Sequence, residues 1–316
     1  MVNPLTRCLE DYALPPYATM CVEDIVPAVR TAIAEMELDL TSVEDDVAAS
    51  EDLTWESVMD RLEIIDDPLS RLWHIVVHLE SVANSAALRA AKATVQTEVI
   101  RMESRRAQST LIFQALERLR GGPAFATYSP EQQRLVEMEI QKATLSGVGL
   151  IDNAKDRFND IHVRLKDVRT QFANNVLDAI QAYELLVYDK SQLAGVSDSI
   201  LASIAQNAVA AGHRDATAAT GPWKLSLETP VYLPIMRTCT NRTLRQELYR
   251  AHMTKASASP HDNAPVMVEI LQLRRERARL LGFESFAELS LADKMAPSVK
   301  AVEAMLQDLV ETCLPR

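Results

Sequence analysis

The chain has 316 residues, 47% of them hydrophobic and 24% charged, and its formal net charge is −11. This composition excludes collagen-like, low-complexity and disulfide-rich secreted proteins, and the excess of acid argues against a nucleic-acid binder, which needs a basic face. The charge is uneven, because residues 35–67 hold 13 acids and one base, Arg61, so that the rest of the chain sums to +1. A total of 8 glycines with 5% aromatic residues favours helix.

Signals that would place the chain in a membrane or outside the cell are missing from the sequence. No stretch approaches ~18 uninterrupted apolar residues, so we expect no membrane span. Residues 1–4 show no basic region followed by an apolar run, so we expect no secretory signal. The cysteines lack the paired spacing of a metal site and predict a reduced, cytoplasmic protein; they are Cys8, Cys21, Cys239 and Cys313.

The first third of the chain reads as helices. Apolar residues from Ile25 to Val47 recur every three or four positions, which predicts one long helix. Thr54 is placed to cap a short second helix, and the proline after Asp67 is expected to restart the chain into a third. We then expect one uninterrupted helix over residues 86–120, ended by the pair of glycines at 121 and 122.

The middle of the chain contains the longest predicted helix. Ser129 and the proline after it begin a helix that Gly147 ends. Asp152 is expected to cap a helix of roughly 30 residues, about 45 Å long at 1.5 Å per residue. A shorter helix over residues 197–211 is closed by Gly212. Alternation over residues 223–228 predicts a strand that Pro230 stops, and this is the only strand we expect.

The last part of the chain returns to helix. Asn241 is placed to cap a helix to about Lys255, and further helices are expected over residues 266–281, 283–292 and 299–314, with Gly282 ending the first of these. The predicted fold class is therefore all-α, with long helices and a small β element near residues 223–228.

Several groups of residues are candidates for chemistry. His74 and His78 lie four apart, the spacing of helical zinc sites, but Ile75 stands where a hydrolytic site needs Glu, so we expect one partly buried and one exposed histidine. The acidic residues 35–67 lack the spacing of a calcium loop and are expected to form a solvated face. A basic run is a possible contact for a peptide carboxylate or another anion, or pairs with acids on a neighbouring helix; it comprises Arg274, Arg275, Arg277 and Arg279.

The common catalytic motifs are missing from the sequence. There is no Gly-x-Ser-x-Gly elbow, and no cysteine has a histidine partner that spacing could nominate. The Gly147-Val148-Gly149 segment follows a helix and lacks the third glycine and the preceding strand of a phosphate-binding loop. The residues alone therefore predict no complete catalytic site and no metal site.

Eight segments resemble, in order, the thimet oligopeptidase family of zinc metallopeptidases, and most closely its oligopeptidase A branch. The longest are 241–251 (NRTLRQELYRA) and 281–296 (LGFESFAELSLADKMA), and the others are residues 53–56, 68–73, 78–85, 145–150, 172–179 and 230–236. The resemblance implies a mostly helical protein with two lobes flanking a channel, which cleaves short peptides with a bound zinc ion.

The sequence departs from the family in one decisive respect. The family's His-Glu-x-x-His helix and its downstream Glu ligand follow the point that matches Ala296, and no such motif occurs here. No zinc ligand or general base can be carried over, so the catalytic and metal residues predicted for this chain are none. The resemblance implies an amino-terminal helical domain over residues 1–190 and the start of the peptidase domain over residues 191–316.

Two functions stay open from the sequence. In the first, the chain is the amino-terminal portion of an oligopeptidase A-like zinc metalloendopeptidase acting on oligopeptides, inactive without the zinc-containing C-terminal half. In the second, it is a stand-alone, non-catalytic helical module that binds a peptide or a partner, such as a separately encoded zinc half. Neither function predicts nucleic acid or membrane as a partner.

Overall fold

A computed structural model describes residue 15 and residues 17–314, and the expectations for residues 1–4 and for Cys8 lie outside this part. The chain divides into two compact units, which are described separately. Unit 1 comprises residues 1–164 and 274–316, and unit 2 comprises residues 165–273. Within the described residues, no helix combines the length and the apolar character needed to cross a lipid bilayer.

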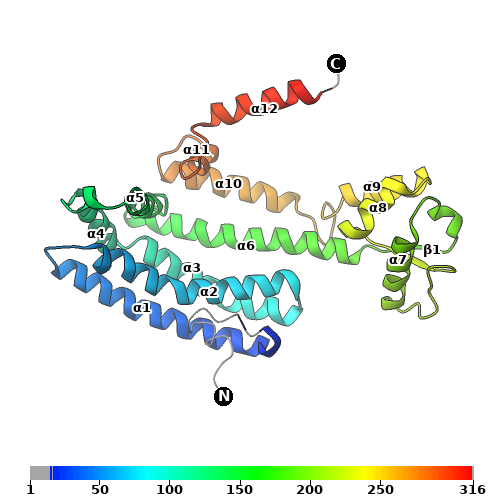
Figure 1. Ribbon diagram of the computed structural model, residues 1–316, viewed down its shortest axis with the longest axis horizontal. Coiled ribbons are helices and arrows are strands. Elements are labelled where there is room, and N and C mark those ends of the chain that lie inside the picture. Colours follow the sequence, from blue (N-terminus) through cyan, green and yellow to red (C-terminus); the bar gives the residue numbers. More distant parts are fainter. Residues whose placement is uncertain (1–14, 16, 315–316) are drawn as a thin grey trace. The chain divides into compact units, whose positions relative to one another are not determined.

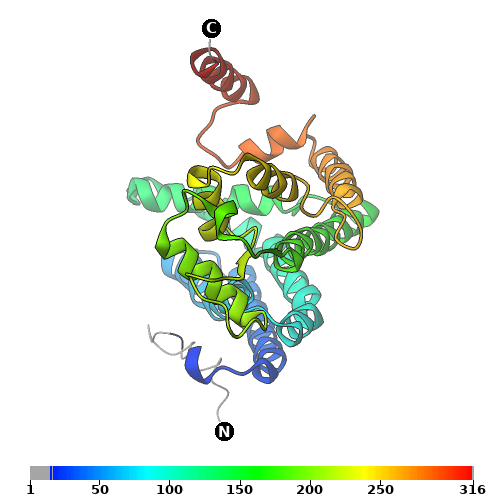
Figure 2. The same ribbon diagram turned by 90° about the vertical axis from the view of Figure 1, so that its right-hand side faces the viewer.

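Unit 1 is built from helices that pack around one apolar core (Figure 1). Helices α1, α2 and α3 lie side by side in both views (Figures 1 and 2). The core contains the apolar stripe of α1, with Val29 and Leu40 each 0% exposed, facing residues such as Leu72 of α2 and Val95 of α3. The helices that contribute to the core are α1 (Ile25–Ala49), α2 (Arg61–Val82), α3 (Ala86–Ala107), α4 (Thr110–Gly121) and α5 (Pro130–Leu145).

The remaining elements of unit 1 come from the start of α6 (Asp152–Ala182) and from the chain after residue 273, which includes the end of α10 (Ala264–Leu280). Two further helices follow, α11 (Phe286–Leu291) and α12 (Val299–Cys313). Serine caps begin both, because Ser285 accepts from the Glu288 amide at 3.2 Å and Ser298 accepts from the Ala301 amide at 3.1 Å. The predicted end of α10 is confirmed, since Gly282 adopts a φ of 81°.

Two predictions for unit 1 were wrong. Asp67 and Pro68 do not restart the chain, because a short π-helical segment over Glu56–Asp60 leads directly into α2, which runs through Pro68. Proline leaves the carbonyl four residues earlier without its partner, and Ile64, at that position, is 69% exposed, so that water can reach this turn. The predicted helix over residues 86–120 is also two helices, separated at Gln108 and Ser109.

The break between α3 and α4 has a local cause. The Ser109 hydroxyl accepts a hydrogen bond from the Ile112 amide at 3.2 Å and so caps α4. The Gln108 side chain donates to the Ser146 carbonyl at 2.8 Å and to Asn159 Oδ1 at 2.7 Å. A continuous helix through Gln108 and Ser109 would lose these hydrogen bonds to the backbone and to α6.

Unit 2 holds a small antiparallel sheet covered by short helices. Strand β1 (Leu185–Val187) pairs with β2 (Trp223–Leu225), so that Val187 lies opposite Trp223. Helix α7 (Asp198–Ala210) packs on β2, followed by α8 (Thr229–Thr238) and α9 (Arg242–Met253). Figure 2 shows α7 and the loops around it facing the viewer. Trp223, 1% exposed, belongs to the apolar core of this unit.

The all-α class with a small β element is confirmed, and several details of unit 2 differ from the prediction. Strand β1 was not predicted, because its three residues, Leu-Leu-Val, are all apolar and show no alternation. Strand β2 ends at Leu225 rather than at residue 228, and Pro230 does not merely stop the strand but lies in the first turn of α8, where its missing N–H costs nothing. The Asn241 cap is confirmed, since its side chain accepts from the Thr243 amide at 3.1 Å.

Candidate functional site

The arginine run lies on α10 and splits into two pairs. The guanidinium of Arg274 lies over the Phe286 ring at 4.8 Å from its centroid, and that of Arg277 lies over the Phe158 ring at 5.3 Å. Both side chains are half-buried, so cation–π packing within unit 1 occupies one face of each. Arg275 and Arg279 are exposed. A peptide carboxylate would therefore meet Arg275 and Arg279 more readily than the other two.

The acid within the same run pairs with a neighbouring helix. Arg157 of α6 donates from Nε and Nη2 to the two carboxylate oxygens of Glu276, at 2.6 and 2.7 Å. These hydrogen bonds hold the pKa of Glu276 below its usual range and raise that of Arg157. The Glu276 carboxylate is therefore engaged by Arg157 of α6.

The two histidines of α2 serve local contacts. His74 Nδ1 lies 2.6 Å from the Ser70 carbonyl one turn earlier, and the His78 ring lies 5.7 Å from the Tyr17 ring. Both histidines are exposed, so the expectation that one is partly buried was wrong. The apolar stripe of α2 runs through Leu72 and Val76 and leaves the face that carries the histidines in solvent.

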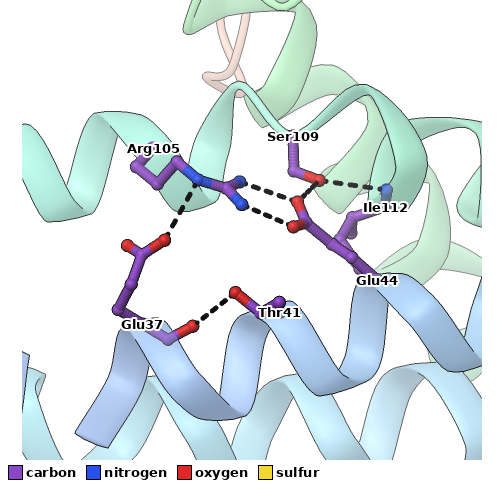
Figure 3. A network of polar contacts seen from close by, with 6 residues as sticks. All are labelled: Glu37, Thr41, Glu44, Arg105, Ser109 and Ile112. Atoms are coloured by element: carbon purple, nitrogen blue, oxygen red, sulfur yellow. Dashed lines mark hydrogen bonds and ion pairs between the residues drawn. The ribbon is translucent and has the colours of Figure 1, made fainter. Parts of the chain in front are cut away.

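The acidic stretch contains a buried carboxylate that the sequence interpretation missed. The Glu44 carboxylate of α1, 7% exposed, accepts hydrogen bonds from Nη1 of Arg105 at 2.7 Å and from the Ser109 hydroxyl (Figure 3). Arg105 also lies 3.5 Å from Glu37, which precedes Glu44 by about two helical turns on the same face of α1. The Arg105 hydrogen bonds hold the pKa of Glu44 below its usual range, outweighing the opposite effect of burial.

This network corrects the expectation of a uniformly solvated acidic face. Arg105 and Ser109 both come from the region where α3 ends and α4 begins, so Glu44 ties α1 to the break between those helices (Figure 3). A signal for Glu44 was present in the sequence, because it follows Leu40 by four residues and so lies at the edge of the apolar stripe of α1.

A cavity of about 620 Å³ opens beside this network, between α1, α3, α4 and α6 of unit 1. Its charged and amide lining comes from Glu44, Arg101, Arg105, Gln108, Lys155 and Asn159. Three cations face one carboxylate, and Arg105 is already engaged with Glu44. Charge therefore suits the cavity to a small anion or to the terminal carboxylate of a peptide.

The residues present do not fit the zinc ion that the family resemblance implies. None of the six histidines begins a His-Glu-x-x-His sequence. The part of the chain that the structure describes also brings together no group of three or more His, Cys, Asp or Glu side chains suited to a metal ion. No chemical step of this chain is therefore assigned to a metal.

Comparison with known proteins matches this helical chain to the domains of a peptidase family. Residues 29–155 match the family "Neurolysin/Thimet oligopeptidase, N-terminal domain", and residues 235–316 match "Peptidase family M3". Together these two matches span more than half of the chain. The chain belongs to the thimet oligopeptidase family, in its oligopeptidase A branch.

Three relatives illustrate the extent of the similarity. The chain is 39% identical over 303 residues to the probable cytosolic oligopeptidase A of Arabidopsis thaliana, covering 96% of this chain and 42% of the relative. It is 37% identical over 321 residues to oligopeptidase A of Salmonella typhimurium and to that of Escherichia coli, covering 100% of this chain and 45% of each relative. The chain thus spans less than half the length of the curated relatives it matches.

Proposed function

We propose that this chain is the amino-terminal portion of an oligopeptidase A-like zinc metalloendopeptidase, and that it builds one wall of a channel that admits short peptides. The observation that carries the proposal is the match of nearly the whole chain to less than half of each relative. The amino-terminal domain and the beginning of the M3 match are present here, and the His-Glu-x-x-His motif is not. Zinc and the groups that activate water belong, in this proposal, to the remainder of the M3 domain.

The test of this proposal uses the chain by itself. We expect the purified chain to bind no stoichiometric zinc and to hydrolyse no oligopeptide. Metal analysis and a peptide digest followed by mass spectrometry measure both. One tightly held zinc ion per chain, or cleavage that a chelator abolishes, would contradict the proposal.

The domain division proposed with this function is an amino-terminal helical domain over residues 1–190 and the start of the peptidase domain over residues 191–316. The family matches that end at residue 155 and begin at residue 235 support a boundary between them. We also propose a cytoplasmic location, which the cytosolic relative and the exposed free thiols of Cys21 and Cys313 support. Fractionation of cells that produce the tagged chain tests the location.

The positively lined cavity favours a second candidate, a non-catalytic module that binds peptides. Here Arg101 and Lys155 would hold the terminal carboxylate of a peptide. We expect the Arg101→Ala/Lys155→Ala variant to lose affinity for free-acid peptides and not for the same peptides as C-terminal amides. Calorimetry with both peptide forms decides this, because equal binding of acid and amide would rule out carboxylate recognition.

A further inference from the structure

Helix α12 carries an apolar face that is largely exposed in the described part of the chain. Valines, leucines and a methionine recur at intervals of three and four residues along one side of the helix; the stripe comprises Val302, Met305, Leu306, Leu309, Val310 and Cys313. No residue of α12 is buried, and four side chains of the stripe are 47–55% exposed, namely Met305, Leu306, Leu309 and Val310. The opposite side carries Gln307 and acids, with Gln307 donating to Glu311 at 2.8 Å.

The surroundings of α12 explain this exposure. The helix contacts α11, beside a cavity of about 620 Å³ lined by residues such as Phe283, Pro297 and Val299. Beyond that end, Figures 1 and 2 show α12, in red, projecting from the rest of unit 1. Helices of this length are marginal in water and gain most of their stability from tertiary packing of an apolar face. An ordered, amphipathic and uncovered α12 therefore indicates a face that another segment covers.

Resting on the proposed function, we propose that the stripe of α12 is the docking surface for the remainder of the M3 peptidase domain, the part that the full-length relatives have and this sequence lacks. The M3 match begins at residue 235 and includes all of α12, so the helix belongs to a domain that is represented here in part. More than half of each relative lies outside the matched region. That length is ample to supply helices that cover one face of α12.

The charges of α12 distinguish this occupant from a lipid surface. Interfacial helices that bind membranes carry Lys and Arg on the polar side. On α12 that side carries Glu303, Asp308 and Glu311 with one lysine, Lys300. The acidic rim would repel anionic lipid and suits a partner helix whose rim is basic.

The experiment mixes this chain with the remainder of the Escherichia coli oligopeptidase A, taken from the point after the region that this chain matches. Hydrogen exchange followed by mass spectrometry reports on the amides of α12, and sedimentation reports on complex formation. We expect α12 amides to exchange at least about tenfold more slowly in the mixture than in the chain alone.

Two variants separate the stripe from the rest of the helix. Leu306→Asp/Leu309→Asp places charges in the stripe and is expected to weaken the complex at least about 100-fold. Ala304→Asp/Gln307→Asp adds the same charges on the opposite side and is expected to bind as the wild type does. Circular dichroism of both variants verifies that each retains the helix content of the parent.

The outcomes distinguish the inference from the proposed function. A complex that forms equally well with both variants, or leaves α12 exchange unchanged, overturns the docking surface and leaves the function standing. The chain alone could also self-associate. If only the stripe variant abolishes that self-association, the occupant is a second copy of the chain, and the proposed docking of the M3 remainder is overturned. If no complex forms, the experiment is repeated with the two parts fused into one polypeptide. A fusion that binds no zinc and has no peptidase activity overturns the proposed function. An active fusion in which the α12 amides stay unprotected overturns the docking surface alone.

Discussion

Helices α1 and α12 have the same kind of sequence and opposite surroundings. Both repeat apolar residues every three or four positions and both are helical. Val29 and Leu40 of α1 are fully buried against α2 and α3, whereas Leu306 and Leu309 of α12 are about half exposed, at 51% and 49%. An amphipathic pattern therefore specifies a face suited to burial, and the segments present in the chain decide whether that face is covered.

The largest difference in stability between the two helices is expected when one leucine in each is truncated. Leu40→Ala is expected to destabilise unit 1 by about 2–5 kcal/mol, because it removes buried methyl groups and leaves a cavity. Leu309→Ala is expected to change stability by less than about 0.5 kcal/mol in the isolated chain. Urea unfolding followed by circular dichroism measures both. Equal costs would mean that α12 is already covered in the isolated chain.

A second effect concerns the carboxylate that ties α1 to the end of α3. Glu44→Ala leaves Arg105 and Ser109 without their shared acceptor, and we expect a loss of about 1–3 kcal/mol, moderated because the Arg105 side chain is 38% exposed. Glu37→Ala is the matched control on the same helix, since Glu37 lies further from Arg105, at 3.5 Å, and is exposed. A similar cost for both variants would contradict the special position of Glu44.

The same carboxylate predicts a pH dependence. Because the pKa of Glu44 is lowered in the folded state, its contribution is present above the ordinary value of 4.5 and is lost as the pH falls through the folded-state pKa. The stability difference between the wild type and Glu44→Gln should therefore shrink as the pH falls below the ordinary value of 4.5. Urea titrations at several pH values measure this, and a difference that grows in acid would have the wrong sign.

Helix caps give a smaller effect of the same kind. Ser109→Ala removes the cap of α4 and also a donor to Glu44, so we expect a cost of about 1–2 kcal/mol. Ser298→Ala removes the cap of α12, and because that helix has no buried face, we expect faster amide exchange within α12 with little change in the unfolding of unit 1. Cooperative destabilisation by Ser298→Ala would show that α12 is part of the core.

The smallest effect on stability is expected at the arginine run. Arg275→Ala/Arg279→Ala should alter stability by less than about 0.5 kcal/mol, since both side chains are exposed. Arg277→Ala should cost more, because it removes packing on Phe158. If this run contacts peptides, the exposed pair should weaken peptide binding without a change in melting temperature. Unchanged binding would leave the run with a packing role.

Much of the helical framework could be predicted from periodicity and caps. The stripe from Ile25 to Val47, the cap at Asn241 and the end at Gly282 act over a few residues, so local sequence contains the information. The break at Gln108 could not be predicted in this way, since its cause is a set of hydrogen bonds to Ser146 and Asn159, which come close only after folding. Strand β1 was missed for a similar reason, because its partner lies about 40 residues away.

The candidate site was less accessible to sequence reasoning than the fold. The arginine run was recognisable from the sequence alone. Its division into stacked and exposed members depends on the rings of Phe158 and Phe286, which lie outside the run. Glu44 was counted among solvated acids because charge runs usually stay in water. The positively lined cavity lies between four helices, and no local sequence pattern predicts which helices pack together.

The central claim, that this chain supplies one part of a peptidase whose zinc-binding part lies elsewhere in the M3 domain, is tested most directly by peptide hydrolysis. Equal amounts of the chain alone and of the chain joined to the remainder of the Escherichia coli enzyme are given the same short peptides with zinc. We predict no cleavage by the chain alone and cleavage by the joined protein that a chelator stops. Cleavage by the chain alone, or none by a folded joined protein, would contradict the account.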